Sequence, residues 1–208
     1  MRSGSPAPGW KNVEPEAYIE CMPTTTKKQN SQQPRSKFYE LLQGQVHNEF
    51  HASQQYTALA VWFDNEDLPE LAKFFYAQAV EERNHAMALV QYMMDTDHHV
   101  TIPSTGEVRN EFTSAKELAE LALEQEKEVT SDIKTLTKAA RSEDDFLGEQ
   151  FMQWFLQEQV EEVATMSTLV NVFERANGNL FEVERFVHKH LQSDDADDDM
   201  PEVAGGKL

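Results

Sequence analysis

The sequence predicts an all-α protein: a four-helix bundle with one long crossover between its second and third helices, and a short fifth helix. Two observations predict this fold class. Apolar residues recur at i, i+3 or i+4 and i+7 through four long segments, the pattern of one buried helix face. The links between these segments are short, long and short in turn, which favours two helical hairpins joined by a crossover.

The first two helices are expected to form an antiparallel hairpin. An apolar face recurs from Phe38 to Phe63, so we expect the first helix over about residues 36–65. The second helix is expected to open at Asp67 as its N-cap, because Glu70 follows three residues later in a capping-box arrangement. Only a few residues separate the two segments, so the helices should be neighbours.

The third and fourth helices are expected to form the second hairpin. Ser114 and Glu117 form a capping box that opens the third helix. The fourth helix is expected to follow Ser142 and to stop at Asn177-Gly178-Asn179, because glycine favours a helix C-terminus. A short fifth helix is expected over residues 180–191.

The link over residues 96–113 determines how the two hairpins connect. A helix of about 27 residues is about 40 Å long, whereas about 18 extended residues reach nearly 60 Å. The link can therefore run the whole length of the bundle. This connection makes a two-hairpin bundle with one long crossover.

Both ends of the chain differ in composition from residues 36–191. Residues 1–35 are rich in Pro, Ser, Thr, Gln and Lys and show no periodicity, so we expect them to be disordered. Residues 192–208 form an acidic tail that we also expect to be disordered and solvated. The helical domain is therefore expected to cover residues 36–191.

The charge and the cysteine content exclude several function classes. The 18 basic and 37 acidic residues give a net charge of −19, which disfavours nucleic acid or an anionic membrane as partner; solubility alone also explains such a charge. The single cysteine, Cys21, excludes a disulfide framework and cysteine-ligated metal sites, and it suits a cytoplasmic location. No run of eighteen apolar residues is present to span a membrane, and the first residues do not form a signal peptide.

One glutamate interrupts the apolar face of each long helix near its middle: Glu49, Glu82, Glu126 and Glu162. Burying a carboxylate is costly unless a positive charge accompanies it. Four helices that place a glutamate at matching depth indicate one shared cation site, and metal sites are built in bundle cores in this way.

Glu82 and His85 lie three residues apart, so both can reach one ion from the same helix face. Carboxylates with one imidazole select metals such as iron or manganese. Two alternatives remain at this point. A single Glu-x-x-His pair also occurs on solvated helices, and a helix rotated by a residue or two would move the glutamates to its rim.

Four sequence motifs resemble the di-iron signatures of bacterial non-haem ferritin, and most of all those of the actinobacterial, mycobacterial-type ferritin. They are His47-Asn-Glu49-Phe, Ala79-Val-Glu81-Glu82-Arg-Asn-His85, Gln125-Glu126 and Trp154-Phe-Leu-Gln-Glu158-Gln159-Val-Glu161-Glu162. The resemblance covers roughly residues 37–191. It implies a ferritin-like bundle that assembles as a hollow shell of twenty-four subunits. Such shells oxidise Fe(II) with dioxygen or peroxide and store ferric mineral.

The resemblance also implies a role for each residue. Glu49, Glu82 and His85 would bind the first iron, with Glu82 bridging to the second. The second iron would be bound by Glu126 and Glu162, with Gln159 adjacent. Glu81, Glu158 and Glu161 resemble an additional third iron site that shares Glu162. Tyr56 resembles the tyrosine near the ferritin centre, and an ordinary core tyrosine is the alternative.

Departures from related families narrow the resemblance. Thr165 follows Glu162 at i+3 where bacterioferritin and rubrerythrin have a second histidine, so the site is asymmetric. Arg83 stands where bacterioferritin has its haem-ligating methionine, so no haem is expected. There is no Cys-x-x-Cys of a rubrerythrin, and the ligands lie on this chain's own four helices, unlike those of Dps-type miniferritins.

Two further expectations concern assembly. Glu149 resembles a residue that lines the three-fold pores of the family, although acidic residues at a helix N-terminus commonly just complement the helix dipole. The C-terminal Gly-Gly-Lys-Leu could make the chain a cargo of an encapsulating shell protein.

A ferritin-like protein that holds a static ion, or none, is the alternative to a ferroxidase.

Overall fold

A computed structural model describes residues 36–191 and 200–208; the expectations for residues 1–35 and 192–199 lie outside the described residues. It contains α1 (Lys37–Asn65), α2 (Pro69–Asp95), α3 (Ala115–Ser142), α4 (Phe146–Ala176) and α5 (Leu180–His190). No strand occurs in the described part of the chain. The predicted all-α class with a short fifth helix is confirmed.

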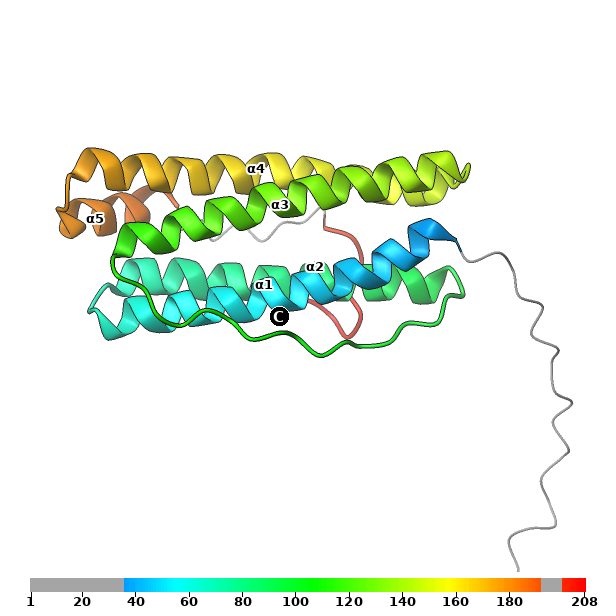
Figure 1. Cartoon of the computed structure of the whole chain (residues 1–208), viewed down its shortest axis with the longest axis horizontal. Helices are drawn as coiled ribbons and strands as arrows, with labels where there is room; N and C mark the ends of the chain where they lie inside the picture. The colour runs from blue at the N-terminus through cyan, green and yellow to red at the C-terminus, as the bar shows by residue number, and fades with distance from the viewer. Residues whose placement is uncertain (1–35, 192–199) are drawn as a thin grey trace, which may run out of the picture. The chain divides into compact units, whose positions relative to one another are not determined.

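The helices pack as two hairpins, α1 with α2 and α3 with α4 (Figure 1). α1 also packs on α3, and α5 lies against α2 and α4. Across the part of the chain that the structure covers, no helix is both long and apolar enough to cross a lipid bilayer.

The link between α2 and α3 runs the length of the bundle beside α1, as predicted (Figure 1). Two glutamines of α1 hold it by pairing their amides with its backbone. Gln43 donates to Thr101 O at 2.7 Å and accepts from Thr101 N at 3.0 Å. Gln55 pairs with Arg109 in the same way, at 2.8 Å in each direction.

The apolar core is divided into two clusters along the bundle axis. One contains Tyr56, Phe63 and the start of α2, together with Val183 and Val187 of α5. The other contains Phe38, Leu42 and the end of α2. The four interrupting glutamates lie between the two clusters, each in the middle of its helix.

The first turn of α2 differs from the expectation. Asp67 is not its N-cap, because it adopts a left-handed conformation with φ 58° in the turn after α1. The helix begins at Pro69, and Glu184 of α5 caps it by accepting hydrogen bonds from Glu70 N at 3.1 Å and Leu71 N at 2.8 Å. The N-cap at Ser114 is confirmed, since its hydroxyl accepts from Glu117 N.

The fourth helix begins four residues later than Ser142. Asp145 caps it by accepting a hydrogen bond from Gly148 N at 2.8 Å. Gly148 is required there, because a Cβ at this position would clash with the ring of the buried Phe38.

The end of the acidic tail is ordered against α2. Ala204 is buried and donates its N–H to Met87 O at 3.2 Å, and Leu208 N donates to Asn84 Oδ1 at 3.3 Å. We expected residues 192–208 to have no fixed structure, and residues 200–208 do not fit that expectation. Apolar Val203 and Ala204 explain the difference, since they pack on the second core cluster.

Replacing Glu184 by alanine should destabilise the domain, because it leaves two N–H groups at the start of α2 without their acceptor. The expected loss is about 1–2 kcal/mol in the free energy of unfolding, measured by urea denaturation. Glu182→Ala is the matched control on the same helix. It removes an exposed pair with Arg185 and should cost less than about 0.5 kcal/mol. Equal losses in the two variants would show that Glu184 does not act as a cap.

Alanine should have opposite effects at two helical glycines. Gly148→Ala overpacks the Phe38 contact and should cost about 1–3 kcal/mol. Gly44 in α1 is exposed and has no atom within 4 Å of an added Cβ, so Gly44→Ala should stabilise the domain by about 0.5–1 kcal/mol. Thermal unfolding of both variants measures the difference, and a change of the same sign would contradict the packing.

Candidate metal centre

The structure buries all four interrupting glutamates and the histidine. The exposed fractions are 1% for Glu49 and Glu126, 2% for Glu82 and His85, and 5% for Glu162. The helix phases derived from periodicity are therefore correct, and the glutamates do not lie on a solvated rim. They share one level of the bundle because each interrupts its apolar stripe near mid-helix.

Ligand atoms of these residues meet in two overlapping groups, each spanning no more than 4.8 Å. One group contains Glu49, Glu82 and His85, and the other contains Glu82, Glu126 and Glu162. Glu82 belongs to both groups. Two cations could therefore bind side by side and share its carboxylate.

A third group extends outward from the same level. It joins His85 and Glu162 to Glu81 and Glu158, which are only half-buried. Glu161, expected to take part in a third site, is exposed and lies outside the three groups found among the described residues.

Two carboxylate oxygens in the core have no amide, imidazole or hydroxyl donor among the described residues: Glu49 Oε2 and Glu162 Oε1. Carboxyls also interact with these two glutamates, Glu82 with Glu49 and Glu126 with Glu162. An orphaned, buried carboxylate oxygen is costly unless a cation satisfies it. These two oxygens lie in different groups, which is what a pair of metal ions would require.

Burial dominates the ionisation of the carboxylates. It raises the pKa of Glu49, and raises the pKa of Glu82 and Glu162 well above the usual carboxyl range. The neighbouring charge of Glu126 is the next cause for Glu82 and Glu162. Burial therefore favours the protonated form of these carboxyls when no cation is bound, and a cation would compete with those protons.

Amide side chains orient the outer oxygens of the cluster. Gln45 Nε2 donates to Glu49 Oε1 at 2.9 Å. Gln159 Nε2 donates to Glu162 Oε2 at 2.5 Å, and Thr130 Oγ1 donates to Gln159 Oε1 at 2.8 Å. The same hydroxyl lies 2.7 Å from Glu126 O, so its one proton is shared between the two acceptors, and Gln159 holds the Glu162 carboxylate through its amide N–H in this arrangement. Sequence reasoning missed Gln45 and Thr130, although each lies four residues from a core glutamate on its own helix.

Tyr56 contacts the carboxylate cluster. Its side chain is fully buried, and its hydroxyl donates a short hydrogen bond to Glu126 Oε1. Burial, followed by the Glu126 charge, raises the pKa of Tyr56 well above its usual value, so the phenol keeps its proton.

Glu149 is engaged in an ion pair at the start of α4. Arg141 Nε donates to its carboxylate at 3.0 Å, and this bond lowers the pKa of Glu149. Its expected pore role stays a prediction.

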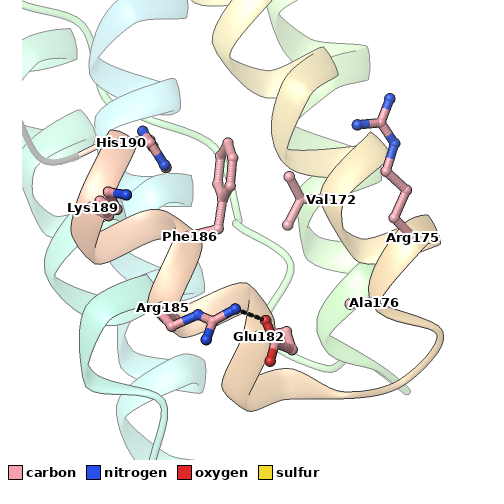
Figure 2. A pocket seen from close by; sticks show the side chains of 8 residues that line it. All are labelled: Val172, Arg175, Ala176, Glu182, Arg185, Phe186, Lys189 and His190. Atoms are coloured by element: carbon pink, nitrogen blue, oxygen red, sulfur yellow. Dashed lines mark hydrogen bonds and ion pairs between the residues drawn. The ribbon is translucent and has the colours of Figure 1, made fainter.

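One open groove lies away from this centre. It has a volume of about 540 Å³ and lies between α4 and α5 (Figure 2). Its lining is Val172, Arg175, Ala176, Glu182, Arg185, Phe186, Lys189 and His190. A second pocket of about 350 Å³ opens between α1 and α3, and Gln45 in its wall connects it to Glu49.

Comparisons with known proteins agree with this geometry. The chain is 58% identical over 175 residues to "Ferritin BfrB" of Mycobacterium tuberculosis, covering 84% of this chain and 97% of that protein. In one strain that relative is named "Bacterioferritin BfrB". "Bacterial non-heme ferritin" of Staphylococcus aureus is 35% identical over 136 residues, covering 65% of this chain and 82% of that protein.

Solved structures with a similar fold are also ferritins. An open pore ferritin from Archaeoglobus fulgidus superimposes with a TM-score of 0.72 at 26% identity, covering 76% of this chain and 97% of that chain. A family model described as "Ferritin-like domain" matches residues 39–176. The chain therefore belongs to the ferritin family and is similar to its mycobacterial type.

Proposed function

We propose that this protein is an iron-storage ferritin whose subunits each oxidise Fe(II) at a di-iron ferroxidase centre. The observation that carries the proposal is the pair of ligand groups that share Glu82, each with an orphaned carboxylate oxygen. Four carboxylates also balance the charge of two Fe(II) ions. Oxygen and imidazole donors without thiolate suit iron.

In this proposal Fe(II) is the substrate and the chain supplies its placement. Glu49, Glu82 and His85 bind one ion, and Glu82, Glu126 and Glu162 bind the other. Two Fe(II) ions give one electron each. Dioxygen that accepts them takes up two protons and becomes hydrogen peroxide, whereas hydrogen peroxide that accepts them takes up two protons and becomes two water molecules. Gln45 and Gln159 keep the carboxylates in position, and the apolar clusters on either side exclude water.

The ferric product must leave for the reaction to repeat. The third group supports such an exit route, because Glu81 and Glu158 are half-buried while His85 and Glu162 are shared with the centre. We propose that it binds a third iron and passes it outward, with Glu161 beyond it.

The shell of twenty-four subunits is also part of the proposal. Large apolar side chains are strongly exposed on α4 and α5 of the subunit, including Phe146 at 71%, Val160 at 70% and Phe181 at 87%. We expect these side chains to be covered by neighbouring subunits in the assembled shell. A cytoplasmic location, the absence of haem and a role as cargo of an encapsulating shell remain expectations.

Aerobic addition of Fe(II) to the purified protein, followed by gel filtration, tests the proposal against a static metal-binding protein. A ferroxidase ferritin develops ferric absorbance that elutes with a cage-sized species. A monomer or dimer that develops no ferric absorbance would overturn the proposal.

Glu82→Ala should abolish fast Fe(II) oxidation, because Glu82 belongs to both ligand groups. His85→Ala should do the same. Loss of groups that merely support metal ligands costs about 10–100-fold, so we expect at least about a 100-fold lower initial rate from stopped-flow absorbance. Glu124→Ala changes an exposed glutamate of α3 and should oxidise iron at the wild-type rate. A Glu82→Ala variant that also did so would refute the assignment.

Glu162→Gln should stabilise the metal-free protein while impairing iron oxidation. A carboxyl whose pKa is raised on folding makes the folded state less stable as the pH rises. The loss of stability begins at the pKa of the unfolded state, about 4.3, and is complete above the pKa of the folded state. The neutral amide avoids that loss. The advantage in melting temperature should therefore be several degrees at pH 8 and should vanish near pH 4, since about 1 kcal/mol corresponds to about 2–4 °C at this size.

The exposed Glu124→Gln is the control for this measurement, and its melting temperature should follow that of the wild type across the pH range. A Glu162→Gln variant that was less stable than the wild type at pH 8 would contradict the inference that the metal-free cluster carries a burial cost.

A further inference from the structure

A continuous file of aromatic rings leads from His85 to the end of the bundle. Trp154 and Phe155 of α4 flank the His85 ring, at centroid distances of 5.6 and 5.9 Å. Phe155 contacts Phe151 at 5.4 Å, and Phe151 stacks on Tyr92 of α2 at 4.0 Å. Every ring is therefore within ordinary aromatic contact of the next.

The outer end of the file is a stacked trio. Tyr92 stacks with Tyr39 of α1 at 6.4 Å, and Tyr39 lies flat on His98, in the turn after α2, at 3.3 Å. Tyr39 and His98 are both half-buried and so reach solvent. The file thus joins the buried ligand to the surface through residues of α1, α2 and α4.

The members of the file differ in how easily they lose an electron. Tryptophan and tyrosine are the side chains most readily oxidised by one electron, whereas phenylalanine only shortens the distance between them. Trp154 is therefore the inner donor, and Tyr92 and Tyr39 are the outer ones.

The fate of the phenol proton decides where oxidation ends. A tyrosine that loses an electron must release its proton. Within the described residues the hydroxyl of Tyr92 is buried and meets no hydrogen-bond geometry; the neighbouring hydroxyl is that of Tyr39, and burial followed by this neighbour raises the pKa of Tyr92. Tyr39 can release its proton to water, so we expect the radical to form on Tyr39.

We propose that this file is a one-electron relay through which Tyr39 completes the reduction of hydrogen peroxide when the centre holds a single Fe(II). The proposal rests on the ferroxidase function proposed above. Two bound Fe(II) ions can supply both electrons that peroxide needs. One Fe(II) ion supplies only one electron. Without a second electron donor, the reduction of peroxide would release a hydroxyl radical beside the ligands.

Peroxide accepts one electron from Fe(II) and one from Trp154. The oxidised Trp154 is then reduced by an electron that Tyr39 supplies through the file. The O–O bond of the peroxide breaks, and two water molecules form with one proton from solvent and one from the Tyr39 phenol. The products are Fe(III) and a Tyr39 radical. A second Fe(II) at the surface then returns an electron, and water returns a proton, to restore the tyrosine.

A second aromatic file gives the competing route. Tyr56 contacts Phe75 at 5.8 Å, Phe75 stacks on Phe63 at 5.2 Å, and Phe63 contacts Trp62 at 5.4 Å. It leads toward the opposite end of the bundle from Tyr39. Oxidation along it would leave the radical at Tyr56 or Trp62, which an experiment can separate from Tyr39.

The test uses the assembled protein, loaded without oxygen with less than one Fe(II) per subunit and then mixed with hydrogen peroxide. Freeze-quenched samples are examined by electron paramagnetic resonance, with ring-deuterated tyrosine to identify tyrosyl signals. A hydroxyl-radical spin trap is measured in parallel. Tyr39→Phe and Tyr92→Phe keep the rings and remove the oxidisable phenols, and their melting temperatures report whether packing is preserved.

The relay predicts a tyrosyl signal in the wild type that disappears in Tyr39→Phe, together with a several-fold increase in trapped hydroxyl radical in Tyr39→Phe and Tyr92→Phe. Tyr76→Phe is the control, because Tyr76 is exposed and pairs with Asp64 outside both files. It should match the wild type in both measurements.

A signal that persists in Tyr39→Phe and is lost in Tyr56→Phe or Trp62→Phe would overturn the relay. So would an unchanged yield of trapped radical in Tyr39→Phe. Failure of the underlying function is distinguishable, since it would appear as a wild-type oxidation rate in Glu82→Ala with two Fe(II) per subunit and dioxygen.

Discussion

The burial of four carboxylates at one level of the core is the constraint on which the rest of the structure depends. Apolar side chains cannot stabilise that level, so the core is divided into two clusters that hold the helices together above and below it. The cost of the layer appears in the raised pKa of Glu82 and Glu162 and in two oxygens without donors. A cation bound at this level would remove that cost and would couple metal binding to the stability of the bundle.

Contacts distant in sequence keep this layer in register. Glu184 of α5 caps α2, and Glu143 accepts from Lys37 N at 2.6 Å and so caps α1. Gln43 and Gln55 hold the crossover on α1. Each polar contact fixes a helix end or a link, and the position of a helix along its axis decides whether its glutamate meets the other three.

The same bundle carries two kinds of chemistry on one level. Carboxylates and His85 face the centre, while Trp154 and Phe155 cover the outer side of the His85 ring. Tyr56 approaches from the opposite cluster and touches Glu126. Aromatic residues therefore surround the ligands on both sides, where they exclude water and are the nearest groups that an oxidant could attack.

Helical periodicity alone determined the four long helices, their buried faces and the mid-helix glutamates, because these properties depend on residues three and four apart. The same spacing identified Glu82 with His85. Only the tertiary structure decided which helix caps which, since the cap of α2 is Glu184 rather than nearby Asp67. It also decided that Thr130 orients Gln159, that Glu161 faces solvent and that residues 200–208 pack on α2. These contacts join residues far apart in sequence, and no local pattern of spacing encodes them.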